Sequence, residues 1–262
     1  MTSRQMTSRH LDRVGLALLT LRPEVARDFE GTLRAVASIG YRELDMYIYE
    51  SALEAPATRA VLDRTGLVCT SARVRTTHLY RGWERFLDAA AKLGARYITL
   101  AYIAAEETVT LRDWHELAEV FNRCGAAAAR HGLTFCYHNH ESEFVPVGGG
   151  GTVPYDLLVA ETDPALVKLQ IDVYWLTRAG REPVGELRRL AGRVATLHLK
   201  DMDATAARGI TTVGRGTIDF AAVLRAAIDT GIGHWYVEED APKVPGIEAV
   251  RFAYRYLEGL DV

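Results

Sequence analysis

The sequence predicts an α/β protein that folds as a single (β/α)8, or TIM, barrel, and three observations carry this prediction. The composition, 48% hydrophobic and 25% charged, is that of an ordinary globular chain, and the length of 262 residues fits one large α/β barrel as well as two smaller domains. Short apolar runs alternate strictly with segments of helical periodicity, which calls for parallel strands. Eight such units fill the chain, the number that closes a barrel. A doubly wound open sheet is less favoured because no G-x-G-x-x-G turn follows the first strand.

The strands are predicted from short apolar runs. In chain order they cover residues 13–19, 41–46, 67–74, 96–101, 133–138, 166–172, 194–199 and 235–238. Because side chains alternate between the two faces of a strand, Leu169 and Ile171 should face the helices while Gln170 and Asp172 line the barrel mouth. Polar side chains inside a barrel are costly unless they bind something.

The helices are predicted from apolar residues that recur every three or four positions, as Leu117, Phe121 and Cys124 do. In chain order they cover residues 23–39, 52–63, 79–93, 111–131, 155–160, 183–191, 220–230 and 247–257. Asp219 directly precedes one of them and is interpreted as its N-terminal cap.

Charge and cysteine usage exclude several classes of protein. The formal net charge is -3 and no block of Lys or Arg occurs, so we expect no nucleic-acid partner. Cys69, Cys124 and Cys136 are widely spaced and form no C-x-x-C pair. They are therefore expected to be free thiols in a reducing compartment rather than disulfides or ligands of a structural zinc ion.

Residues 1–12 are interpreted as a disordered N-terminal lead-in, and residues 13–262 as the barrel domain. The lead-in repeats Met-Thr-Ser-Arg and has no apolar segment of the length that a signal peptide needs. No run approaches the roughly 18 apolar residues of a membrane span. The expected location is the cytoplasm, with no membrane association.

Three predicted strands end in residue types that bind metals: Asp172, His198 and Glu238. In a barrel these ends meet at one mouth, where two carboxylates and an imidazole suit Mn, Co, Mg or Zn. Taken singly, Asp172 could cap the turn that follows it, and His198 could be a satisfied core histidine. Their equivalent positions on neighbouring strands favour the metal site.

The fourth ligand is sought in residues 135–144, which read F-C-Y-H-N-H-E-S-E-F. Glu143 lies just past the strand, where a loop could fold it over the mouth, and His138 lies at the strand end itself. We favour Glu143 because a hard divalent ion that binds sugar oxygens prefers carboxylates. His138 stays the alternative.

With these residues in view, the chain resembles the xylose isomerase-like superfamily of sugar phosphate isomerases and epimerases, in its His-Asn-His branch, from about Val14 to Leu257. The matching stretches are V-G-L-A-L-L-T-L-R, I-G-Y-R-E-L-D, Y-H-N-H-E-S-E-F, I-D-V-Y-W, A-G-R-E-P, L-H-L-K-D, V-G-R-G-T-I-D-F and Y-V-E-E-D. The resemblance implies one barrel that holds one divalent metal, most often Mn. Its ligands here would be Glu143 or His138, with Asp172, His198 and Glu238.

The resemblance also implies proton transfer next to a carbonyl through a metal-bound enediolate. His140 and Glu238 are the candidates for acid and base, and Lys200 for electrostatic stabilisation. The residues expected to contact the substrate are His138, Arg73, Asp45, Trp175 and Asp201. Trp175, like Tyr47, Tyr49 and Tyr174, could stack on a sugar ring or belong to the core. Arg73 stands where similar sequences usually carry a histidine, so it could bind a substrate anion or mark a partly lost site.

We therefore predict a divalent-metal-dependent isomerase or epimerase of a small sugar, polyol or keto-sugar. Because the same enediolate can expel a group from the β-carbon, a lyase acting on a keto-inositol or a 3-keto-glycoside is the close alternative. A non-catalytic sugar-binding protein is a third possibility. A metal-free glycosidase is disfavoured, since Asp172 and His198 make most sense with a metal. The expected partner is a small carbohydrate, and an exposed helix face could form a homo-oligomer.

Overall fold

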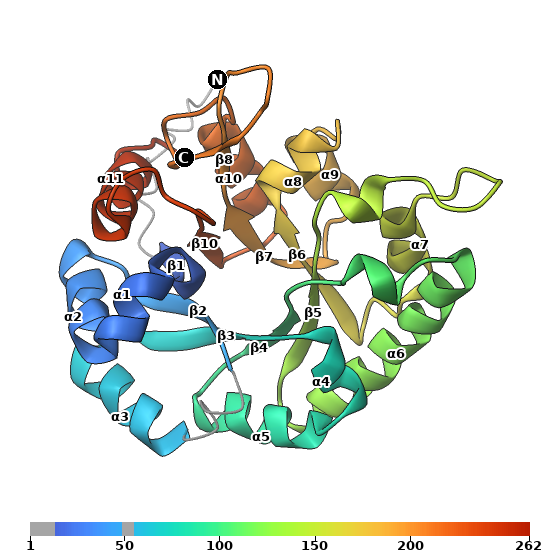
Figure 1. The fold of residues 1–262 in the computed structure, drawn as a ribbon, viewed down its shortest axis with the longest axis horizontal. Helices are drawn as coiled ribbons and strands as arrows, with labels where there is room; N and C mark the ends of the chain where they lie inside the picture. The colour runs from blue at the N-terminus through green and yellow to red at the C-terminus, as the bar shows by residue number, and fades with distance from the viewer. Residues whose placement is uncertain (1–13, 49–54) are drawn as a thin grey trace, which may run out of the picture.

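The structure, a computed structural model, describes residues 14–48 and 55–262. Across these ranges, eight parallel strands close into a barrel in the order β1-β10-β7-β6-β5-β4-β3-β2, and the helices surround it (Figure 1). The single-domain (β/α)8 prediction is confirmed. The expected lead-in at residues 1–12, the start of the predicted helix 52–63, and Tyr49 lie outside the described residues.

The barrel strands are short, and their register aligns the polar ends of neighbouring strands. They are β1 (Gly15–Ala17), β2 (Glu43–Tyr47), β3 (Val68–Val74), β4 (Tyr97–Leu100), β5 (Thr134–His138), β6 (Val167–Asp172), β7 (Val194–Leu199) and β10 (Trp235–Val237). His138 pairs with Gln170, and Asp172 pairs with His198. A small antiparallel hairpin, β8 (Asp201–Met202) with β9 (Ile210–Thr211), follows β7 and was not predicted.

Helical segments connect the strands around the outside of the barrel. They are η1 (Leu18–Leu21), α1 (Arg22–Arg27), α2 (Phe29–Ile39), α3 (Ala55–Thr65), α4 (Thr76–Tyr80), α5 (Trp83–Lys92), η3 (Ala105–Glu107), α6 (Leu111–Arg130), η4 (Ser142–Phe144), α7 (Pro154–Glu161), α8 (Val173–Arg178), α9 (Pro183–Arg189), α10 (Phe220–Asp229) and α11 (Gly246–Glu258). Within the described ranges, no helix is long and apolar enough to cross a membrane.

Two predicted helices are divided. The segment 23–39 breaks at Asp28, whose backbone is extended and whose carboxylate accepts a hydrogen bond from the Gly31 amide, capping α2. The segment 79–93 breaks before α5 at Gly82, whose φ of 74° lies in the left-handed region that favours glycine. The prediction that Asp219 caps a helix is confirmed, since it accepts from the Ala222 amide at 2.9 Å.

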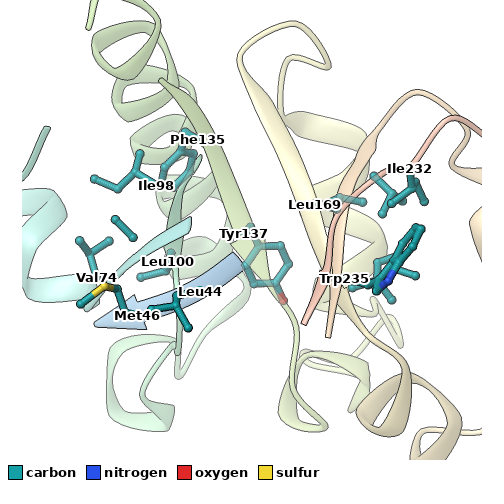
Figure 2. Packing of buried hydrophobic residues seen from close by; sticks show 14 of the residues in the cluster. Leu44, Met46, Val74, Ile98, Leu100, Phe135, Tyr137, Leu169, Ile232 and Trp235 are labelled. Atoms are coloured by element: carbon teal, nitrogen blue, oxygen red, sulfur yellow. The ribbon is translucent and has the colours of Figure 1, made fainter. Parts of the chain in front are cut away.

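The hydrophobic core lies between the barrel and the helices. Leu44, Leu100 and Leu169, from three barrel strands, belong to it and are shown together with Phe135 in Figure 2. Leu169 packs in this core as the alternation on β6 predicted. The three cysteines are free and buried. Apolar packing outside the barrel thus leaves the polar positions of the strands to point inward.

Candidate metal and active site

Four buried side chains converge at the carboxyl ends of four strands. His138 ends β5, Asp172 ends β6, His198 lies near the end of β7, and Glu238 directly follows β10. All four are at most 1% exposed, and one donor atom of each lies within 4.8 Å of the others. We call these residues the donor group; it brings together three predicted ligands with His138, the alternative to Glu143.

Two atoms of the donor group indicate that it fits a cation. His138 Nε2 and Asp172 Oδ2 lie 3.9 Å apart, and among the described residues neither has a hydrogen-bond partner, although the Lys200 ammonium lies 3.2 Å from Asp172 Oδ2. A buried nitrogen lone pair that faces a buried carboxylate oxygen is costly unless a proton or a cation lies between them. With two imidazole nitrogens and two carboxylate oxygens, the residues present fit one divalent ion such as Mn, Co or Zn.

Both histidines are oriented by acceptors behind them. The Nδ1–H of His138 donates to Gln170 Oε1 at 3.0 Å, and the Nε2–H of His198 donates to Asp45 Oδ2 at 2.6 Å. With its Nδ1–H assigned to Gln170, His138 keeps a lone pair on Nε2 that is directed at the donor group. Burial would lower the pKa of His198, but Glu238 and Asp45, which face its two nitrogens, raise it, so Nδ1 would release a proton to bind a metal. Gln170 was not among the predicted site residues, although the alternation that selected Asp172 places it on the same face.

Glu238 is the most heavily engaged carboxylate of the site. Its Oε1 accepts from Arg73 Nη1 at 2.7 Å, and its Oε2 lies 3.0 Å from Lys200 Nζ and 2.9 Å from His198 Nδ1. Burial alone would raise the pKa of Glu238, but Lys200, His198 and Arg73 hold it well below its usual range. Glu238 is therefore a fixed negative charge.

Lys200 is the internal counter-ion of the donor group. Its buried ammonium lies 3.2 Å from Asp172 Oδ2, as an ion pair without hydrogen-bond geometry, and 3.0 Å from both Glu238 Oε2 and Asp240 Oδ1. Burial would lower the pKa of Lys200, but these three carboxylates raise it, so the side chain stays charged. The ring of Trp175 lies 5.4 Å from the ammonium.

His140 borders the donor group on the side of the mouth. Its ring centroid lies 4.8 Å from that of His138, 5.3 Å from Tyr102 and 5.6 Å from Trp175. Burial, followed by the charges of Lys200 and Arg73, lowers the pKa of His140 to about 3, so its imidazole is neutral near pH 7. Its Nδ1 finds no hydrogen-bond partner within the described ranges.

Glu143, the favoured fourth ligand, lies outside the donor group. Its Oε2 accepts from the backbone amide of His140 at 3.2 Å and from the Ser142 hydroxyl at 2.8 Å. Burial raises its pKa although Ser142 and Tyr137 act in the opposite direction. The 3-10 turn η4 folds this carboxyl back under the loop, so the geometry supports His138 as the ligand and Glu143 as the residue that shapes the loop of His140.

The residues predicted to contact substrate fall into two groups. Trp175 lies partly exposed beside Lys200 and His140, where a substrate can reach it. Asp45 and Arg73 are buried behind His198 and Glu238, so they support the donor group. Asp201 accepts hydrogen bonds from the backbone amides of residues 202, 214, 216 and 218, which assigns its carboxylate to the loop before α10. Direct substrate contact by these residues stays a prediction.

The family model for the xylose isomerase-like TIM barrel matches residues 33–259 of this chain. The chain belongs to this family. A solved sugar phosphate isomerase/epimerase from Parabacteroides distasonis ATCC 8503 is similar in fold, with a TM-score of 0.79 and 24% identity over 98% of this chain and 96% of that one.

Curated relatives of this family member are similar over part of their length. An inosose dehydratase of Clostridium tetani (strain Massachusetts / E88) is 27% identical over 168 residues, 57% of this chain and 55% of the relative. An inosose dehydratase of Geobacillus thermodenitrificans (strain NG80-2) is 31% identical over 146 residues, 50% of this chain and 48% of the relative. The matches thus span about half the length of these relatives.

Proposed function

We propose that the chain is a divalent-metal-dependent enzyme that moves a proton at the carbon beside the carbonyl of a small sugar, polyol or keto-sugar, as an isomerase or epimerase. The observation that carries the proposal is the donor group, in which two imidazoles, each held by an acceptor behind its ring, face two carboxylates. Beside it lies a neutral imidazole, His140, which provides a base next to a Lewis-acid site.

The ligands would be His138 Nε2, Asp172 Oδ2, His198 Nδ1 and a carboxylate oxygen of Glu238. We favour Mn, with Co, Mg or Zn as alternatives, because the set combines imidazoles with hard oxygens. When bound, such an ion polarises a carbonyl and stabilises negative charge on the adjacent oxygens.

In this proposal His140 takes the proton from the carbon beside the carbonyl, because its Nδ1 is unengaged and the ring lies at the mouth. Lys200 stabilises the charge that develops on the substrate oxygens, as a fixed ammonium beside them. Glu238 is assigned to the metal rather than to proton transfer, since Arg73, Lys200 and His198 engage both of its oxygens.

Dehydration is the second candidate, and the inosose dehydratase relatives favour it. There, His140 removes the proton beside the carbonyl, the C–O bond at the next carbon breaks, and the hydroxide leaves as water with the proton that His140 had taken up. Both candidates share the first step and differ only in the fate of the enediolate.

The first experiment compares the protein purified without chelator with a His198→Ala variant by elemental analysis. We expect about one equivalent of a divalent metal in the wild type and its loss in the variant. The metal-loaded protein is then incubated with ketohexoses and keto-inositols in D2O. Deuterium uptake by the recovered sugar supports isomerisation or epimerisation, and a new enone absorbance supports dehydration. A wild type that binds no metal after soaking in Mn would overturn the proposal.

A further inference from the structure

We propose that the barrel mouth holds a second subsite, over the ends of β1 to β4, that binds a neutral hydroxyl-rich group attached to the reacting sugar. The substrate would then be a neutral glycoside about the size of a disaccharide rather than a sugar phosphate. This inference rests on the proposed function, because it assumes that the reacting ring sits at the donor group.

The subsite is a cavity of 440 Å³ lined by the loops that follow these four strands. Tyr47 lines it, and the guanidinium of Arg73 lies 4.9 Å from the Tyr47 ring. Tyr102 lines it as well, with its ring 5.3 Å from that of His140. Since Arg73 holds Glu238, the cavity adjoins the site on two sides. In the proposed binding mode, a substituent on the reacting ring passes Tyr102 into this cavity.

The size of the cavity decides how far the substrate extends. Its volume falls within the roughly 300–1,000 Å³ typical of small-molecule pockets. The lining residues come from the β1 to β4 side, whereas the donor group comes from β5, β6, β7 and β10. A single sugar ring held at the donor group would leave this second space to water, so the cavity suits a substituent on that ring.

The charges of the lining favour a neutral substituent. Arg22 and Arg75 contribute two positive charges, and Glu106 and Glu107 offset them with two negative ones. A phosphate carries close to two negative charges and is held by clusters of arginine that exceed the local acids. Among the described residues, the lining of this cavity provides no such excess.

The deeper cations do not change this balance. Arg73 is paired with Glu238, and Lys200 is shared by three carboxylates. A divalent ion would offset the remaining acids of the donor group rather than attract a phosphate to the cavity. The mouth thus offers both hydrogen-bond donors and acceptors, which suit the hydroxyl groups of a neutral sugar because a hydroxyl can donate and accept.

Tyr102 supplies a flat face for a second ring. Its side chain is 51% exposed, and its backbone carbonyl accepts a hydrogen bond from the Thr76 hydroxyl at 2.9 Å, which fixes the loop that carries it. An exposed aromatic ring beside polar side chains combines apolar contact area with hydrogen bonding, the combination that a sugar ring requires.

The test measures equilibrium binding to the Mn-loaded protein by calorimetry. The probes are glucose, cellobiose, maltose and glucose 6-phosphate. We expect at least one disaccharide to bind about tenfold more tightly than glucose, and the phosphate to bring no gain. Tyr102→Ala should remove the disaccharide advantage. Phe252→Ala, which truncates an exposed aromatic on the outer helix α11, should keep it.

A second variant tests the charge argument. Glu106→Gln leaves the lining with one excess positive charge, so the affinity for glucose 6-phosphate should rise severalfold while that for glucose stays the same. The inference is overturned if the wild type prefers glucose 6-phosphate, if no disaccharide binds better than glucose, or if the advantage survives Tyr102→Ala.

Failure of the subsite can be told apart from failure of the proposed function. Suppose that the protein binds Mn and exchanges the C–H of keto-sugars but binds disaccharides no more tightly than glucose. It then has the proposed function without the subsite. A protein that takes up no metal, yet shows a Tyr102-dependent disaccharide advantage, has the subsite on a non-catalytic sugar-binding barrel.

Discussion

Lys200 and a metal ion would compete for the same oxygens, because the ammonium lies within 3.2 Å of Asp172 Oδ2 and Glu238 Oε2. At the effective dielectric constant of about 20 that describes protein sites, unit charges about 4 Å apart interact by about 4 kcal/mol. The ammonium therefore stabilises the carboxylates without metal and opposes a divalent ion. Asp240 provides a third partner, toward which Lys200 can move.

We predict that Lys200→Met raises the affinity for Mn at least about tenfold while it lowers turnover. The variant removes the opposing charge and also the group that we propose to stabilise the enediolate. Calorimetric Mn titration and deuterium exchange measure the two effects separately. Unchanged or weaker Mn binding would show that the ammonium does not oppose the ion.

The two assignments of the fourth metal ligand, Glu143 and His138, predict opposite results for two variants. Glu143→Gln should keep full Mn binding because its carboxyl faces the His140 amide and Ser142, whereas His138→Ala should lose most of it. Elemental analysis of both variants decides between them. Metal lost with Glu143→Gln and kept with His138→Ala would restore the carboxylate assignment.

The raised pKa of Glu143 also predicts a pH dependence of stability. The folded state holds the Glu143 proton at pH values where the unfolded chain, with a pKa near 4.5, has released it. The folded state then binds more protons, so the free energy of unfolding falls as pH rises above that value. Glu143→Gln removes this dependence. Urea unfolding at pH 5.5 and 8 measures the free energy of unfolding of both proteins. Relative to the wild type, the variant should be more stable at pH 8 than at pH 5.5. An equal difference in stability at the two pH values would contradict the assignment.

At the scale of elements, the loop between β8 and β9 holds the short helix α8 that follows Asp172. Arg208 Nη2 donates to the Thr177 carbonyl at 2.7 Å, and the Arg208 carbonyl accepts from the Tyr174 hydroxyl at 3.0 Å. Arg208 does this with a φ of 51°, in the left-handed region. The helix carries Trp175, so this contact positions one wall of the mouth.

We predict that Arg208→Ala destabilises the protein more than Arg208→Gly does. Both variants lose the side-chain bonds to the end of α8, but only alanine keeps the left-handed strain, which costs about 1 kcal/mol or more relative to glycine. Denaturant unfolding of the two variants measures the difference. Equal stabilities, or a weaker glycine variant, would mean that the backbone is not strained at this position.

At the scale of the whole molecule, barrel closure assembles the site from residues far apart in the chain. Asp45 on β2 meets His198 on β7 across 153 positions of sequence, and Arg73 on β3 meets Glu238 after β10 across 165. The donor group, together with the Asp45 and Arg73 that hold it, is therefore complete only in the closed barrel, and metal binding and barrel stability should be coupled.

We predict that Mn stabilises the wild type by about 2.7 kcal/mol at a free concentration a hundredfold above its Kd, because the ion binds the folded state alone. Thermal unfolding with and without chelator measures this gain as a rise in Tm. His198→Ala should show no such rise. An equal rise in both proteins would place the bound ion elsewhere.

Local sequence determined much of the outcome. Alternation of apolar runs and helical segments was enough to predict eight units and the barrel, since each element buries its own apolar face. The strand-end pattern selected Asp172, His198 and Glu238, because the two-residue period of a strand sets which side chains point inward. The sequence did not predict the extended backbone at Asp28 or the six-residue helix α8, because the capping hydrogen bonds that set these local features outweigh weak helical patterns.

Only the tertiary structure decided how the inward residues meet. It brought His138 rather than Glu143 to the other three, because the turn η4 satisfies the Glu143 carboxyl within its own loop. It also set Gln170 and Asp45 behind the two histidines, since those contacts depend on strand register and on closure of the barrel. Sequence determines which face a side chain takes, and distance across the barrel determines its partner.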